Sequence, residues 1–270
     1  MDIAHFKEIV RYSHQNQRTM EGKVKDLYAR IGMDYERELL DVMQVVRPLF
    51  REKSYIVIEL PLADHEIGAL CYKGESFGYT LLNSSLPYVN VNFALCHETY
   101  HILFQEELAD NKLELYMNEH YFDYEEEYAA NLFAGMLLMP ERSYRMMFQK
   151  FTWDTLEGDT EVSVVVRLMG YFKVPYMAAL VRCYELGLFK AGETLETLMK
   201  VDEGCIRREF RRLWMDEAIL CPTRKDDFEF LKSAVISFGM EYAEDGLISE
   251  RTVKKAVQNM TRIYCEVRGE

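Results

Sequence analysis

Residues 93–101 read Phe-Ala-Leu-Cys-His-Glu-Thr-Tyr-His and contain two histidines, His97 and His101, with Glu98 directly after the first. The apolar residues on both sides predict a mostly buried helix over residues 91–105. Four residues advance a helix by slightly more than one turn, so the two imidazoles project from the same face about 6 Å apart along its axis. This H-E-x-x-H spacing is typical of zinc-dependent hydrolases, in which both histidines hold the metal and the glutamate takes a proton from water.

The motif fixes only three residue types, so a coincidental match on an ordinary helix is the alternative interpretation. The apolar flanks argue against coincidence, because buried imidazoles need polar partners and a metal ion supplies them. We therefore predict one Zn²⁺ per chain, with His97 and His101 as ligands and Glu98 as the catalytic general base.

A catalytic zinc ion normally takes three protein ligands and leaves its fourth position for water, so a third ligand is expected downstream. Residues 124–138 predict a helix that ends before Pro140, and Glu127 and Asn131 share one of its faces. We predict Glu127 as the third ligand and Asn131 as the hydrogen-bond partner of a ligand histidine. His120 is the alternative third ligand, because imidazole also binds zinc well.

Hydrolysis of a carbonyl compound also needs a hydrogen-bond donor to the oxyanion that forms. Three residues between the two predicted helices could donate, namely His120, Tyr121 and Tyr124. The alternative interpretation places all three on a surface loop without a role in the site.

Three short runs with β-branched and aromatic residues, 54–60, 67–72 and 77–82, precede the motif. They predict a small antiparallel sheet packed on the motif helix. The rest of the chain is mostly helical, which makes the predicted fold class α+β. Extra helices are expected at both termini.

The predicted organisation has four regions. They are an N-terminal helical region (1–50), the catalytic core (51–158), a helix-turn-helix-like segment packed on that core (159–190) and a C-terminal helical region of unassigned role (191–270). A chain of this length can bury about three quarters of its unfolded surface, so a sizeable core is expected.

Charge and composition limit the partners and the compartment. The formal net charge of −13 argues against direct nucleic-acid binding, because the chain creates no general basic field to attract phosphate. The six cysteines lack C-x-x-C spacing and are expected to be reduced thiols. The N-terminus resembles no signal peptide, and no run of about 20 apolar residues predicts a membrane span. We therefore expect a cytoplasmic protein.

Three motifs together resemble the ImmA/IrrE family of zinc metallo-endopeptidases from bacteria and their mobile elements. They are Phe-x-x-x-His-Glu-x-x-His at 93–101, Glu-x-x-Ala-Asn-x-Phe-Ala at 127–134 followed by Leu-Leu-Met-Pro at 137–140, and the helical segment 162–188. The resemblance covers about residues 50–190. Members of that family usually have glycine before the second histidine, where this chain has Tyr100. Residues 191–270 resemble nothing in the family.

The resemblance implies a zincin-like, minimal gluzincin core with His97, His101 and Glu127 on zinc and Glu98 as base. It also implies cleavage of a protein substrate, expected to be a repressor-type regulator of a mobile element or stress response. In zincin-like architecture a strand at the sheet edge pairs with the substrate backbone. By analogy Tyr79, Leu81 and Asn83 are the predicted edge-strand residues.

Two other functions fit the sequence. The first is a non-catalytic zincin-fold protein, similar to an anti-repressor or antitoxin, that binds a partner stoichiometrically. The second is a DNA-binding regulator that uses the helix pair in residues 162–188, which has the proportions of a helix-turn-helix.

Overall fold

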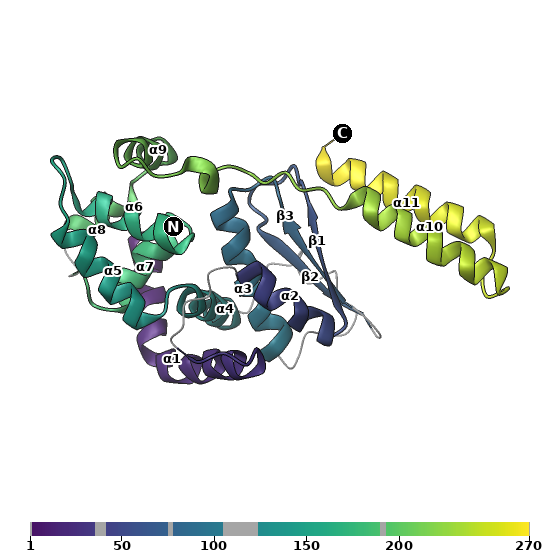
Figure 1. The fold of residues 1–270 in the computed structure, drawn as a ribbon, viewed down its shortest axis with the longest axis horizontal. Coiled ribbons are helices and arrows are strands. Elements are labelled where there is room, and N and C mark those ends of the chain that lie inside the picture. The colour runs from purple at the N-terminus through teal and green to yellow at the C-terminus, as the bar shows by residue number, and fades with distance from the viewer. Residues whose placement is uncertain (1, 36–41, 75–77, 105–123, 190–192, 270) are drawn as a thin grey trace.

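The computed structural model describes residues 2–35, 42–74, 78–104, 124–189 and 193–269 (Figure 1), and every structural statement below refers to these residues. The helices are α1 (Ile3–Arg30), α2 (Val42–Glu52), α3 (Tyr88–Phe104), α4 (Tyr124–Leu138), α5 (Glu141–Trp153), α6 (Glu161–Phe172), α7 (Tyr176–Glu185), α8 (Glu193–Met199), α9 (Glu203–Arg212), α10 (Phe228–Glu244) and α11 (Glu250–Arg268), with a short 3-10 helix at Glu217–Leu220. The strands are β1 (Tyr55–Leu60), β2 (Ala69–Lys73) and β3 (Gly78–Asn83). The predicted α+β class is confirmed.

The three strands form one mixed sheet in the order β1-β3-β2. β2 and β3 are antiparallel, with Ala69 opposite Leu82, whereas β1 runs parallel to β3, with Tyr55 opposite Gly78. The wholly antiparallel sheet expected from the sequence is therefore corrected to a mixed one. The reason is that β3 inserts between the two earlier strands and does not extend them as a meander.

The strand order also corrects the edge-strand prediction. Tyr79, Leu81 and Asn83 lie on β3, which is hydrogen-bonded to a neighbour on each side and has no free edge for a substrate. The fully buried amide of Asn83 holds the connection between β1 and β2. Its Oδ1 accepts from the Leu62 amide at 3.1 Å, and its Nδ2 donates to the Asp64 carbonyl at 2.8 Å.

The motif helix α3 lies between the sheet and α4 near the centre of the molecule (Figure 1). Leu95 and Cys96 are completely buried, as are Ala130 and Ala134 on α4. The small side chains of Ala130 and Ala134 let the axes of α3 and α4 approach each other closely. Each large apolar side chain buried in this core contributes roughly 1.5–3 kcal/mol. One continuous core cluster extends from Phe6 on α1 to Leu220, so all four predicted regions contribute to it.

The helix pair α6 and α7 is bent by 107° at the break between its helices. These are helix-turn-helix proportions, as the sequence predicted. No residue of α7 is exposed, because the helix packs against α1, α4 and α6. The second helix therefore presents no open face to a DNA groove. No individual helix among the described residues has both the length and the apolar character needed to cross a membrane.

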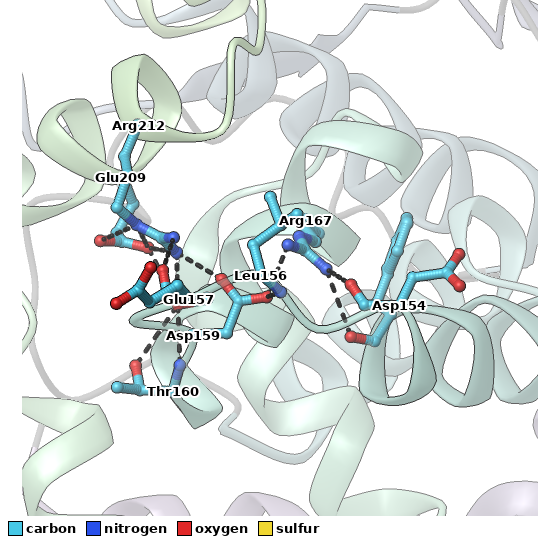
Figure 2. Close-up of polar contacts among 10 residues, drawn as sticks. Asp154, Leu156, Glu157, Asp159, Thr160, Arg167, Glu209 and Arg212 are labelled. Atoms are coloured by element: carbon cyan, nitrogen blue, oxygen red, sulfur yellow. Dashed lines mark hydrogen bonds and ion pairs between the residues drawn. The ribbon is translucent and has the colours of Figure 1, made fainter.

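The loop before α6 is tied to α6 and α9 by a network around Asp159 (Figure 2). One carboxylate oxygen accepts from Arg212 at 2.6 Å, and the other accepts from Arg167 at 2.6 Å and from the Leu156 amide at 2.8 Å. Burial acts to raise the pKa of Asp159. The Leu156 hydrogen bond and the two guanidinium groups outweigh burial, so the pKa is lowered.

Residues 221–227 lead from the 3-10 helix past the end of β1 to α10 (Figure 1). Asp227 and Glu59 exchange two hydrogen bonds of 2.9 Å, one from each main-chain amide. At the far end of α11 the Val267 carbonyl accepts from the Ala63 amide at 2.8 Å. The pair α10 and α11, which we call the C-terminal hairpin, is therefore held at one end by β1 and at the other by the connection that follows β1, and its tip projects away from the body.

The Asp159 network generates a stability prediction. Asp159→Asn leaves the largely buried Arg167 without its counter-charge, so we expect the free energy of unfolding at pH 7 to fall by about 3 kcal/mol. Because the pKa of Asp159 is lowered in the fold, the loss is full above its ordinary pKa of 3.8 and shrinks as the pH falls below it. Urea denaturation of the wild type and Asp159→Asn at pH 7 and below pH 3.8 measures how the loss of stability changes with pH.

Glu196→Gln is the matched control for this prediction. It breaks an ion pair with Lys200 in which both side chains are more than half exposed, and it should leave the free energy of unfolding almost unchanged. Equal losses in the two variants would contradict a stabilising role for the Asp159 network.

Candidate metal centre

The two motif histidines lie on one face of α3, as the sequence predicted. Their Nε2 atoms are 3.0 Å apart, and the ring centroids are separated by 4.8 Å. His101 is buried and His97 is half-buried, so both imidazoles are held by their surroundings and still reach a common point. Two unprotonated nitrogens this close repel each other, so the pair requires a shared proton or a metal cation between them.

Glu127 on α4 completes the cluster. Its Oε2 lies 3.2 Å from Nε2 of His97, and its Oε1 lies 3.7 Å from Nε2 of His101. Ligand atoms from the three residues all lie within 4.8 Å of one another, so the group could hold a metal ion. Two imidazole nitrogens and one carboxylate oxygen are a donor set that fits zinc and leaves one tetrahedral position for water.

The cluster behaves electrostatically as a cation site. Burial acts to lower the pKa of His97, but the hydrogen bond with Glu127 and the nearby carboxylates outweigh it, so the pKa is raised. Burial acts to raise the pKa of Glu127, but the two imidazoles outweigh it, so the pKa is lowered. The site therefore favours one positive charge between its ligands, and a metal cation can take the place of that proton.

Asn131 lies one turn after Glu127 on the same face of α4. Its Oδ1 is 3.1 Å from Nδ1 of His97, which is the contact that the sequence predicted for it. An amide oxygen can only accept, so His97 donates from Nδ1 and keeps the lone pair of Nε2 for a metal. Asn131 thus determines both the tautomer and the orientation of this ring.

Glu98 projects from α3 toward the sheet side of the cluster and is buried. Its Oε2 has no hydrogen-bond partner among the described residues. Burial raises the pKa of Glu98 to about 7, His97 acts to lower it and Glu127 adds to the rise. A buried, unpaired carboxylate is costly unless a cation or water normally accompanies it, and a pKa near neutrality suits a proton acceptor.

Tyr100 replaces the glycine that is usual in the ImmA/IrrE family, and the structure shows where its ring goes. The ring is buried and packs against Phe133 on α4, with centroids 5.8 Å apart. The Lys23 ammonium on α1 donates to its hydroxyl at 2.9 Å and lies 4.4 Å from the ring centre. The larger residue therefore fills the junction of α1, α3 and α4.

The edge strand that packs against α3 is β2. Its Cys71 interacts electrostatically with Glu98, and burial raises the pKa of this thiol to about 12. The chain just before β2 also packs closely on α3, because a Cβ added to Gly68 would already be in van der Waals contact with Ala94, at 3.5 Å. The sequence predicted the three strands, but it does not reveal which of them lie at the edges of the sheet.

A cavity of about 230 Å³ adjoins the cluster beyond Asn131, between α1, α3, α4 and α7. Its walls are mainly apolar and include Phe93, Leu132, Met177 and Val181. Sequence reasoning missed this cavity, because its lining comes from four helices that are distant in the chain. Phe93 lies one turn before His97, so the cavity continues along the same face of α3.

Two of the predicted oxyanion donors, His120 and Tyr121, lie outside the described residues. Tyr124 is the first residue of α4, and its side chain also lies outside the description. His120 as alternative ligand and all three oxyanion assignments therefore stay predictions.

The Asn131 contact leads to a prediction about metal affinity. Asn131→Ala frees His97 to rotate and to change tautomer, so we expect zinc affinity to fall by about 10- to 100-fold. Competition with a chromophoric chelator measures this change. The control is Asn90→Ala, because Asn90 is a half-buried residue on α3, two turns before His97. This variant should leave the zinc affinity unchanged. Equal affinities for wild type and Asn131→Ala would show that the contact does not orient a ligand.

Two comparisons with known proteins were informative in different ways. No curated protein matches the chain. Residues 52–184 match the family model described as the IrrE N-terminal-like domain, Peptidase_M78. The match extends from the end of α2 to α7 and includes the whole cluster, and it supports a peptidase activity of metallopeptidase type. Residues 52–184 therefore form an IrrE N-terminal-like domain.

Proposed function

We propose that the protein is a zinc-dependent endopeptidase that cleaves a cytoplasmic protein, with a repressor-type transcriptional regulator as its substrate. The observation that carries the proposal is the combination of two unlike carboxylates in one site. Glu127 is poised to stay ionised as a ligand. Glu98 is buried beside it, has an Oε2 with no hydrogen-bond partner among the described residues, and has a pKa of about 7. Hydrolysis with an activated water needs one carboxylate that stays ionised and one that can accept and release a proton.

The residues of the site have separate tasks in peptide hydrolysis. A zinc ion held by His97, His101 and Glu127 would supply Lewis-acid activation of water and of the scissile carbonyl. Glu98 accepts a proton from the attacking water at its free Oε2 and passes it to the leaving amine nitrogen. Asn131 keeps the His97 ring in the orientation needed throughout.

The position of β2 at an edge of the sheet that the structure describes supports an extended peptide as the substrate. A peptide segment can add to β2 by main-chain hydrogen bonds, which replaces the earlier assignment of this role to β3. We therefore expect cleavage within an extended segment of the substrate.

The substrate class and the compartment rest on different support. A repressor-type substrate is what the resemblance to ImmA/IrrE peptidases implies. The cytoplasmic location is supported by the cysteines, all six of which are free thiols, three of them buried. Zinc is supported by the donor set, because two imidazoles and one carboxylate are common ligands of catalytic zinc.

Glu98→Gln tests the proposal. The amide keeps the size of the side chain but cannot accept the proton, so we expect an unchanged zinc content and peptidase activity at least about 1000-fold lower. Mass spectrometry of new peptide N-termini measures cleavage of a proteome-derived peptide library and of any repressor encoded beside this gene. Glu66→Gln, an exposed position in the β1–β2 connection, is the matched control and should be fully active.

Two results would contradict the proposal. Full cleavage by zinc-loaded Glu98→Gln would remove Glu98 as base. A zinc-loaded wild type that binds the repressor one to one without cutting it would favour the stoichiometric binding protein.

A further inference from the structure

The C-terminal hairpin, α10 with α11, projects from the body and has very little core of its own (Figure 1). Only Phe228 on α10 and Val253 on α11 are buried. An amphipathic helix needs a partner surface for its apolar stripe, and two helices alone rarely bury enough area to be stable. The hairpin therefore carries more apolar surface than its own packing uses.

Apolar residues of both helices form one face. The two helices meet where the Phe228 and Tyr264 rings stack at 3.7 Å and where Gly239 lies against Val253. A helix turns about 100° per residue, so the side chain three positions after a contact residue points about 60° away from the direction of the partner helix. The turn has the same sense on both helices. Because the helices are antiparallel, both resulting stripes turn to the same side of the hairpin. We call them together the hairpin face, which consists of Leu231, Phe238, Tyr242, Ala256, Ile263 and Val267.

The hairpin face is strongly exposed. Phe238 is 61% exposed, Tyr242 52% and Ile263 50%. With about 200 Å² for a fully exposed aromatic residue, the hairpin face presents roughly 450 Å². A stable interface buries about 800 Å² on each partner, so this apolar area would supply more than half of one.

The charges at the borders of the hairpin face are complementary. Beside the α10 stripe lie Glu241 and Asp245, and beside the α11 stripe lie Lys255, Arg262 and Glu266, all of them exposed, with Arg262 paired to Glu266. The α10 border is therefore acidic, whereas the α11 border carries a net positive charge. A two-fold arrangement that places α10 of one copy against α11 of the other brings acidic and basic borders together. One hairpin thus carries both halves of a self-complementary surface.

We propose that the C-terminal hairpin is a dimerisation element, and that the hairpin faces of two copies pack together as a four-helix bundle. Two helices from each copy would then enclose a shared core of the kind that four-helix bundles have. The hairpin projects away from the sheet, while the metal centre lies on α3 and α4 in the body (Figure 1). Dimerisation through the hairpin therefore leaves the metal centre accessible.

The test is the mass of the full-length protein in solution. Analytical ultracentrifugation in the micromolar range should give twice the chain mass of 31.9 kDa for the wild type. Phe238→Glu and Ile263→Glu each place a charge in the centre of the proposed bundle, from different helices. Each should raise the dimer dissociation constant by about 100-fold or more.

Ile236→Glu is the matched control, because Ile236 is also exposed on α10 but lies about 160° around the helix from Phe238. It should remain dimeric, and circular dichroism should show equal helix content in all variants. A monomeric wild type overturns the proposal. So does a dimer that survives both substitutions in the hairpin face, or one that Ile236→Glu disrupts equally.

Discussion

The close packing of α3 against α4 is the constraint on which the site depends. Two imidazoles come from one helix and the carboxylate from another that begins twenty residues after it ends, so the site exists only where the two helices touch. Completely buried alanines at 130 and 134 permit that approach. Tyr100 fills the other side of the junction and is held by Phe133 and Lys23. The same packing that builds the core therefore positions the ligands.

Burial and neighbouring charge give the two glutamates of the site opposite properties. Glu127 faces two imidazoles, which outweigh its desolvation and lower its pKa. Glu98 is more deeply buried and has an oxygen without a partner among the described residues, so desolvation dominates and raises its pKa to about 7. A cation at the ligands would favour the ionised form of Glu98 again. The same residue type thus supplies both the candidate metal ligand and the candidate base.

Helical periodicity and motif spacing in the sequence predicted those parts of the fold in which the residues lie within a few turns of one another. The span of α4, the shared face of His97 and His101, and the Asn131 contact follow from helical periodicity and motif spacing. The position of β3 between its neighbours did not follow, because strand order depends on long-range pairing that alternation does not encode. The cavity beside Asn131 escaped prediction for the same reason. The hairpin face also required knowing which side of α10 meets α11.

The zinc content of the purified protein tests the central claim most directly. Elemental analysis should be made on the wild type, on Glu127→Ala and on Glu125→Ala, an exposed position in the same turn of α4. The account predicts about one zinc per chain in the wild type and in Glu125→Ala, and much less in Glu127→Ala. Equal zinc in all three would remove Glu127 from the site. A folded, zinc-supplemented wild type without metal would contradict the account altogether.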